Sequence, residues 1–220
     1  MTSLQRIFSP IDFGLIRHLV YQLHEPSAPP LPGIEAQMAV SANQTPSHWR
    51  AIPGSQQSAV LILLYPKHSQ WHIALMLRVK GDKTHSGEIS FPGGRMEEKD
   101  PSPTFTALRE AHEELDIHPE KVEVLGELTQ LYIPVSNFLI YPILAYTHKK
   151  PRFRARESEV AEIMEVRLKD LLAPQALQKI PMRLGSGLRI LVPSFEVGPH
   201  PIWGATAMIM NELLELIRRR

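Results

Sequence analysis

The spacing of apolar residues changes along this chain, and each change predicts a new element. Continuous apolar runs of strand length, bounded by polar or turn-forming residues, predict strands. We expect strands at residues 59–65, 71–79, 122–128, 138–146 and 188–197. Residues 66–70 separate the first two runs and predict a hairpin loop.

Three other stretches have the features of helices. Residues 11–23 carry apolar side chains at helical spacing, and residues 203–217 predict a closing helix. Ser102 followed by Pro103 is typical of a helix start, because a hydroxyl can cap the first turn and proline fits the first helical position. The His-Pro pair at residues 118–119 predicts where that helix stops.

The order of these elements predicts an α/β fold. Strands, an enclosed helix, more strands and a final helix are typical of a mixed sheet with helices on both faces. Before the first strand, residues 25–54 hold six prolines, which predict a covering arm or a linker: Pro26, Pro29, Pro30, Pro32, Pro46 and Pro53. We therefore expect residues 1–57 to form an N-terminal helix and a Pro-rich arm, and residues 58–220 to form the functional domain.

Composition narrows the function classes. A chain of 220 residues with 43% apolar content can bury one full core. A net charge of +1 gives no global field for nucleic acid or a membrane surface. The absence of cysteine excludes disulfides, thiolate zinc sites and a cysteine nucleophile. The ten histidines show no zinc-site spacing, and we expect His112 to lie on the surface.

Targeting signals are weak in this sequence. No apolar run approaches the roughly 18 residues that a membrane helix needs. The first ten residues lack the apolar core of a signal peptide, and Pro10 and Asp12 disfavour an organelle transit segment. We expect a soluble cytoplasmic protein.

The candidate chemistry lies in the central predicted helix. Glu110, Glu113 and Glu114 are related by i, i+3 and i, i+4, so they project from one helix face. Their like charges repel, and a hard divalent cation such as Mg²⁺ removes that conflict. An apolar stripe of Leu108, Ala111 and Leu115 is expected roughly opposite the glutamates. A solvated acidic face is the alternative for a Glu-rich helix considered alone.

Two neighbouring features favour the metal site. Arg109 lies four residues before Glu113, where it can orient that carboxylate. Upstream, Phe91 and Pro92 lead into the adjacent glycines at residues 93–94, which allow torsions and close approach that other residues forbid. The carbonyl of Gly94 is a candidate additional metal ligand.

This combination resembles the Nudix box, the signature of the Nudix hydrolases. Gly94, Asp100 and the run from Arg109 to Ile117 match its pattern of Gly, Glu, Arg-Glu and Glu-Glu. The chain departs from the pattern in three ways. Asp100 replaces a glutamate, one extra residue precedes Arg109, and Asp116 replaces the final glycine, which is a mild change because Asp tolerates the left-handed conformation. The resemblance implies a Nudix-type α/β/α sandwich with a mixed sheet.

Other stretches resemble the coenzyme A pyrophosphatase branch of that family. They are residues 86–94 (SGEISFPGG), 157–163 (ESEVAEI) and 203–207 (WGATA), and the likeness runs from about residue 58 to 216. The resemblance weakens at residues 76–79 and 85–88, where that branch usually has other sequences. Coenzyme A is therefore the expected substrate, with 4′-phosphopantetheine and an adenosine bisphosphate as products.

The resemblance also implies roles for individual residues. Mg²⁺ or Mn²⁺ would be held by Glu110, Glu113 and Glu114, with the Gly94 carbonyl as a further ligand. A general base must reach the attacking water, and in this family it is a box glutamate or a glutamate of a later loop. The loop candidates are Glu157 and Glu159. The arginines around them are candidate phosphate contacts, although solvated arginines are the commoner outcome: Arg152, Arg154 and Arg156.

Several alternatives remain open. The sequence lacks a P-loop, and its Gly-Ser-Gly at residues 185–187 lacks the third glycine of a dinucleotide-binding motif. A non-catalytic Nudix-like binding or regulatory module is a serious alternative, although such proteins typically lose box glutamates. ADP-ribose or another nucleotide competes with coenzyme A as substrate. We expect a small-molecule nucleotide as partner, without nucleic acid or membrane, and a homodimer is left open.

Overall fold

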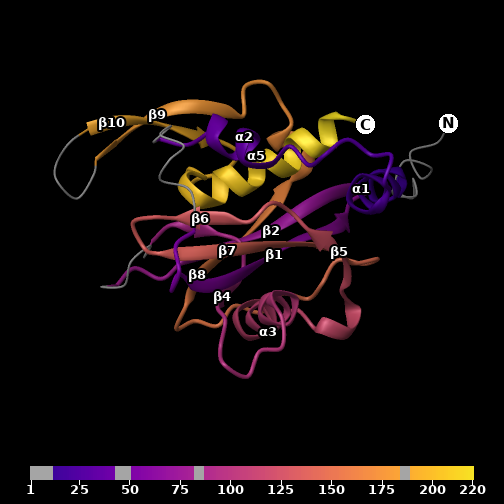
Figure 1. The fold of residues 1–220 in the computed structure, drawn as a ribbon, viewed down its shortest axis with the longest axis horizontal. Coiled ribbons are helices and arrows are strands. Elements are labelled where there is room, and N and C mark those ends of the chain that lie inside the picture. The colour runs from indigo at the N-terminus through magenta and orange to yellow at the C-terminus, as the bar shows by residue number, and fades with distance from the viewer. Residues whose placement is uncertain (1–11, 43–50, 82–86, 184–188) are drawn as a thin grey trace.

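The computed structural model describes residues 12–42, 51–81, 87–183 and 189–220. Its centre is an eight-stranded mixed sheet (Figure 1). The strands of this sheet are β1 (Gln56–Lys67), β2 (Gln70–Arg78), β3 (Ile89–Ser90), β4 (Gly93–Arg95), β5 (Glu123–Glu127), β6 (Leu131–Ile133), β7 (Phe138–Tyr146) and β8 (Val160–Arg167). A separate antiparallel hairpin consists of β9 (Leu177–Arg183) and β10 (Arg189–Phe195).

Helices cover both faces of the sheet. They are α1 (Gly14–His24), α2 (Gly33–Ala39), α3 (Pro103–Leu115), α4 (Leu168–Leu171) and α5 (Gly204–Arg218), with a 3-10 turn, η3 (Pro119–Lys121), after α3. In Figure 1, α3 lies on one side of the sheet, and α2 and α5 lie on the other. The predicted α/β/α sandwich with a mixed sheet is therefore confirmed. No helix in the described part of the chain is long and apolar enough to cross a membrane.

The sheet is mixed because β1 pairs with both parallel and antiparallel strands. It runs parallel to β7 and antiparallel to β2 and β4. On its far side, β2 pairs antiparallel with β8 along most of its length. The short strand β4 lies beside β1 and precedes α3 in the chain.

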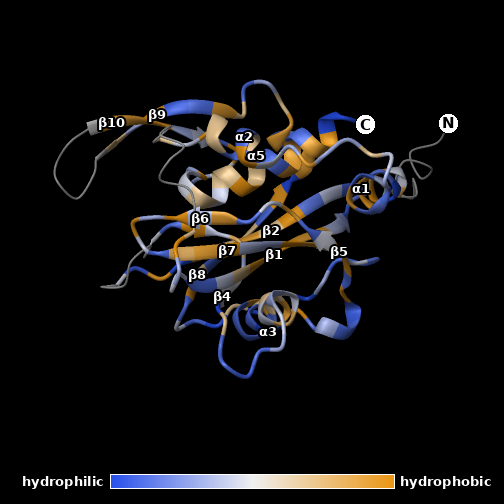
Figure 2. Cartoon of the chain, viewed as in Figure 1, coloured by the Kyte–Doolittle hydropathy of each residue, from blue (hydrophilic) through white to orange (hydrophobic). Residues whose placement is uncertain are grey.

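Alternation along β1 separates two hydrophobic cores. Leu61, Leu63 and Tyr65 face α3, whereas Ile62 and Leu64 face the side of α5. This is the period-2 pattern of a strand that is buried on both faces, and it explains the continuous apolar run in the sequence. In Figure 2 the strands carry much of the hydrophobic colour, whereas α3 and its flanking loops are largely hydrophilic.

The Pro-rich segment contains an element that its composition concealed. Residues 33–39 form α2, which packs on α5. The buried side chain of Gln37 donates to Glu212 of α5 at 2.8 Å. Leu15 and Leu19 of α1 also belong to the core on the α5 side. The described parts of the N-terminal segment are thus packed on the same core as the sheet.

The predicted strands are confirmed, with adjusted ends. β1 is longer than expected at both ends, whereas β2 has the expected length and is shifted by one residue. A two-residue turn with positive φ at His68 and Ser69 replaces the predicted five-residue loop. Strand β8 was not predicted from the sequence. Strands β3, β4, β6 and β9 were missed; the first three have only two or three residues, too few for a period to be recognised. The predicted strand at residues 188–197 is β10, outside the central sheet, and residue 188 lies outside the described residues.

Candidate active site

Helix α3 has the predicted start but ends early. The Ser102 hydroxyl accepts a hydrogen bond from the Phe105 backbone N–H at 3.2 Å, and Pro103 is the first helical residue. The helix ends at Leu115, so the stop predicted at residues 118–119 is three residues late. Asp116 adopts the left-handed conformation, with φ of 58°. The chain reverses there, before the His-Pro pair is reached.

Two glycines bring β4 into contact with α3. Gly93 has φ of 155°, and a Cβ at this position would overlap the carbonyl oxygen of Ala59 on β1. A Cβ on Gly94 would lie 2.5 Å from the carboxyl carbon of Glu110. The adjacent glycines therefore allow close approach on both sides, as the sequence predicted. Gly94 and Glu110 are brought together.

Glu114 is the most buried glutamate of α3. Its side chain is 1% exposed and accepts a hydrogen bond from the Gly93 backbone N–H at 2.8 Å. The Arg78 guanidinium lies 3.8 Å away. Burial raises the pKa of Glu114 to about 8, against the lowering by these two partners. The carboxylate is thus removed from water with few compensating donors.

The position of Glu114 corrects one prediction about this helix. The apolar stripe was expected roughly opposite all three glutamates, but Glu114 is buried on the same side as Ala111 and Leu115. Residues 111 and 114 are neighbours on a helix surface, so a side chain at position 114 can lie against β4 at the rim of the core. Leu108 is only partly buried.

The other two glutamates lie progressively further out. Burial raises the pKa of Glu110 above its ordinary value, and the charges of Glu113 and Glu159 add to that effect, whereas Arg109 opposes it. Glu113 is 43% exposed. Arg109 contacts both, at 2.9 Å from Glu110 and 3.3 Å from Glu113. The contact expected between Arg109 and Glu113 is therefore present.

Arg109 is itself fixed by Asp100, and sequence reasoning missed this pair. The guanidinium donates to both carboxylate oxygens of Asp100, at 3.1 and 2.9 Å. Such a bidentate contact fixes the plane of the guanidinium. The Arg109 guanidinium lowers the pKa of Asp100 to about 2, helped by the Glu97 N–H and the Thr106 hydroxyl. Its place in the box pattern was the signal that could have identified it.

A loop after β7 reaches the open side of the glutamates. The backbone N–H groups of Arg154 and Arg156 donate to the carbonyls of Leu115 and Glu114, at 3.0 and 2.9 Å. These bonds satisfy carbonyls at the end of α3, which have no partner within the helix. The loop is thereby fixed at the last turn of α3.

The loop adds charge of both signs to the site. A guanidinium nitrogen of Arg156 lies 3.5 Å from Glu113 and 3.5 Å from Glu159. The side chain of Glu159 is 37% exposed, and its charge acts on Glu110 and Glu114. Glu157 is exposed at the turn, so the structure brings Glu159 to the other carboxylates and leaves Glu157 in solvent.

Arg78 is a site residue that sequence reasoning did not identify. It is the last residue of β2, and besides approaching Glu114 it donates to the Ser90 hydroxyl at 3.3 Å. Residues 76–79 were considered in the sequence only as a departure from the coenzyme A pyrophosphatase branch, and Arg78 was given no role because β2 and α3 meet only in the folded chain. Arg152 and Arg154, proposed from the sequence as phosphate contacts, have exposed side chains.

The donors at this site fit a hard divalent cation. Glu110, Glu113 and Glu114, here called the glutamate cluster, offer carboxylate oxygens on adjacent helical turns. Arg109, which contacts Glu110 and Glu113, is also bound to Asp100, so it neutralises the cluster only in part. A cation at this position would supply the missing positive charge.

Among the described residues, cavities lie on both sides of the sheet. One, of about 560 Å³, is lined by Lys150, Pro151, Arg152, Phe153, Ile163 and Glu165. It lies in the segment that leads to Arg156, and Phe153 and Ile163 pack on the α3-side core. A cavity of this size suits a drug-sized or nucleotide-sized ligand.

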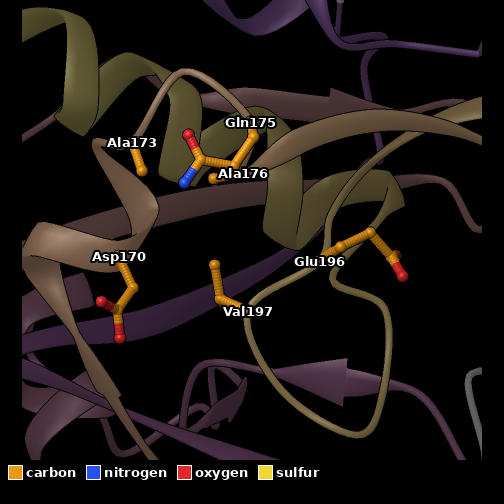
Figure 3. Close-up of a pocket in the computed structure, with 6 residues that line it drawn as sticks. All are labelled: Asp170, Ala173, Gln175, Ala176, Glu196 and Val197. Atoms are coloured by element: carbon orange, nitrogen blue, oxygen red, sulfur yellow. The ribbon is translucent and has the colours of Figure 1, made fainter.

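Figure 3 shows the other cavity, of about 330 Å³. It is lined by Asp170, Ala173, Gln175, Ala176, Glu196 and Val197. Ala176 belongs to the core on the α5 side, so this cavity is away from the glutamate cluster. Its two carboxylates do not suit a polyanionic ligand.

Comparison with known proteins identifies similar sequences. A family model described as the NUDIX domain matches residues 55–184. A Pectobacterium atrosepticum protein named Uncharacterized Nudix hydrolase NudL is 34% identical over 171 residues, covering 77% of this chain and 87% of that protein. The Photorhabdus laumondii protein of the same name is 33% identical over 172 residues, covering 77% of this chain and 89% of that protein.

Solved structures share the fold at lower identity. A Nudix hydrolase from M. smegmatis, RenU, aligns with a TM-score of 0.52 and 17% identity, covering 75% of this chain and 87% of that chain. A MutT/nudix family protein from Enterococcus faecalis aligns with a TM-score of 0.53 and 16% identity, covering 78% of this chain and 65% of that chain. At such identities the likeness concerns the fold alone.

Proposed function

This chain belongs to the Nudix hydrolase family, and we propose that it is a divalent-metal-dependent pyrophosphohydrolase whose preferred substrate is coenzyme A or a close derivative. Hydrolases of the pyrophosphatase type are the family's general class, and divalent metals are its general cofactors. One observation carries the catalytic proposal for this chain. Glu114 is buried with few donors beside Glu110 and Glu113, an arrangement that a bound cation would stabilise.

We propose that the glutamate cluster holds Mg²⁺ or Mn²⁺, with the Gly94 carbonyl as a further ligand. The absence of cysteine and the all-oxygen donor set favour these hard cations. When bound, the cation supplies Lewis acidity towards the phosphate groups of the substrate. Asp100 and Arg109 would act as positioning residues, since Arg109 reaches both Glu110 and Glu113.

We propose Glu159 as the general base. It would accept a proton from water as the water oxygen bonds to one phosphorus and the bridging P–O bond breaks, which yields two phosphate monoesters. Its nearness to the glutamate cluster supports this role over the exposed Glu157. Arg156 would orient Glu159 and meet a substrate phosphate, because it is half-exposed between Glu113 and Glu159.

The choice of coenzyme A rests on residues and on a cavity. The stretches at residues 86–94, 157–163 and 203–207 resemble the coenzyme A pyrophosphatase branch. In the cavity of about 560 Å³, Arg152 is a candidate phosphate contact, whereas Lys150 is paired with Glu165 at 2.7 Å and Phe153 packs against Tyr65. ADP-ribose and other nucleoside diphosphate derivatives also carry phosphates and remain the alternative substrates.

Competition kinetics tests the proposal. The purified chain is incubated with coenzyme A, ADP-ribose and a nucleoside triphosphate, each with Mg²⁺ or Mn²⁺, and the products are identified by mass spectrometry. We expect 4′-phosphopantetheine and an adenosine bisphosphate, the highest kcat/KM for coenzyme A, and loss of turnover in excess chelator. A higher kcat/KM for another substrate would overturn only the substrate assignment. Binding of these nucleotides without any turnover would instead identify a non-catalytic module.

A further inference from the structure

The C-terminal end of α3 carries a second group of metal-type donors, separate from the glutamate cluster. His112, Asp116 and His118 place one ligand atom each within 4.8 Å of one another. A Nε2 nitrogen of each histidine lies 3.8 Å from the same Asp116 oxygen. The three side chains are between 44% and 47% exposed, so an ion can reach them from solvent.

Local geometry explains how residues with unremarkable spacing meet. His112 and Asp116 are four residues apart and share a helix face. The left-handed conformation of Asp116 reverses the chain, with its N–H donating to the His112 carbonyl at 2.9 Å. His118 is thereby folded back onto the last turn of the helix. Its ring centroid lies 5.2 Å from that of His112.

A further carboxylate is placed as an outer partner of a metal-bound histidine. While Nε2 of His118 faces Asp116, its Nδ1 lies 3.5 Å from Glu120. Histidines that bind metals almost always donate their other ring N–H to a carboxylate, carbonyl or water, which fixes the ring and the tautomer. The helix end itself adds negative potential that favours a cation.

From these contacts we infer that His112, Asp116 and His118 form a binding site for a divalent transition-metal ion of the Zn²⁺, Ni²⁺ and Co²⁺ class. Two imidazoles and one carboxylate suit such ions, whereas Mg²⁺ prefers oxygen ligands. Ligand atoms of a tetrahedral site with 2.0–2.1 Å bonds lie about 3.4 Å apart, so rotation of exposed side chains is sufficient to close the site. The inference does not depend on the proposed hydrolase activity.

Titration with NiCl₂ by isothermal calorimetry tests the site, with Mg²⁺ in excess throughout. His118→Gln removes one donor from an exposed side chain, and we expect it to bind one Ni²⁺ fewer than the wild type. Asp116→Asn should also lose that ion, and Asn tolerates the left-handed conformation. Glu120→Gln should weaken binding by about tenfold, because it removes only the outer partner. The glutamate cluster is shared by all these proteins and cancels in the comparison.

His200→Gln is the matched control. His200 is similarly exposed and lies 3.7 Å from Glu162, and among the described residues it belongs to no group of three such ligands. It should retain the full Ni²⁺ stoichiometry. NMR should show the His112 and His118 imidazole signals broadened by the first Ni²⁺ equivalent. Equal Ni²⁺ binding by wild type and His118→Gln, equal loss in His200→Gln, or no binding by the wild type would overturn the inference.

Discussion

Helices α3 and α5 lie on opposite faces of the sheet, and each buries a glutamate. On α5, Glu212 is fully buried and accepts hydrogen bonds from the Gly33 N–H at 3.2 Å, the Thr129 N–H at 3.1 Å and the Gln37 amide at 2.8 Å. Both carboxylate oxygens are used. The surrounding donors belong to α2 and to the loop between β5 and β6, so this glutamate joins three segments of the chain.

On α3, Glu114 is buried to a similar degree but has weaker support. Among the described residues it accepts a hydrogen bond from Gly93, and its nearest guanidinium, that of Arg78, is 3.8 Å away. Burial of a charge is costly unless donors or an opposite charge compensate it. The contrast teaches that burial alone does not distinguish a structural carboxylate from a functional one. The number of fixed donors around the carboxylate does.

The largest expected effect concerns activity at Glu114. Glu114→Gln preserves the side-chain volume but removes a proposed metal ligand, so kcat/KM should fall by about a thousandfold. Without added metal, the melting temperature should stay close to that of the wild type, because the neutral amide keeps the side-chain volume and an oxygen that can accept the Gly93 N–H. Steady-state kinetics and thermal melts measure both quantities. A variant with wild-type turnover and an unchanged metal requirement would refute the assignment.

The next effect separates the two loop glutamates. Glu159→Gln should reduce kcat by about a hundredfold, because a general base contributes roughly that much. Glu157→Gln, the matched control in the same loop, should stay within about threefold of the wild type, since a solvated side chain loses little by neutralisation. Similar large losses in both variants would show that the loop charge acts as a whole.

The third prediction concerns Glu212, where we expect the substitution to reduce stability and to leave activity nearly unchanged. Glu212→Gln turns one acceptor into a donor that faces N–H groups, so the free energy of unfolding should fall by about 3 kcal/mol and the melting temperature by about 8 °C. At a temperature where the variant is folded, kcat/KM should remain within about twofold of the wild type, since the change is remote from the reacting groups. Denaturant and thermal unfolding measure the loss. An unchanged stability would remove the distinction between the two carboxylates.

The smallest effect concerns Asp100, which fixes Arg109. Asp100→Asn should cost about 2 kcal/mol, or about 6 °C in melting temperature near neutral pH. The folded-state pKa of about 2 is below the ordinary 3.8, so the stabilisation is complete above 3.8 and is lost as the pH falls towards 2. The difference in melting temperature between the wild type and Asp100→Asn should therefore become smaller as the pH of the thermal melts is lowered.

Asp170→Asn is the control for that series. Asp170 forms a 2.7 Å contact with Arg167, but the pair is exposed, so its loss should change the melting temperature little. A pH-independent difference between wild type and Asp100→Asn would contradict the assigned pKa.

Much of the scaffold was predictable because local pattern and tertiary environment agree. The run at residues 59–65 is continuously apolar because β1 is buried on both faces, and a buried strand needs no polar positions. Ser102 and Pro103 act within one turn of helix, so their signal does not depend on distant contacts. The short strands β3, β4 and β6 gave no such signal. Each is held by pairing with a longer strand of the sheet, and that pairing is not visible in its own two or three residues.

The sequence by itself determined the glutamate cluster, since helical spacing places Glu110, Glu113 and Glu114 on adjacent turns whatever surrounds them. Only the tertiary structure decided which of them is buried. That depends on β4, whose pairing with β1 sets Gly93 against Glu114 and leaves Glu113 in solvent. The approach of Glu159 was likewise settled by backbone bonds between its loop and the end of α3. Periodicity specifies the direction in which side chains project from their own helix or strand. Their burial and the compensation of their charge depend on residues distant in sequence.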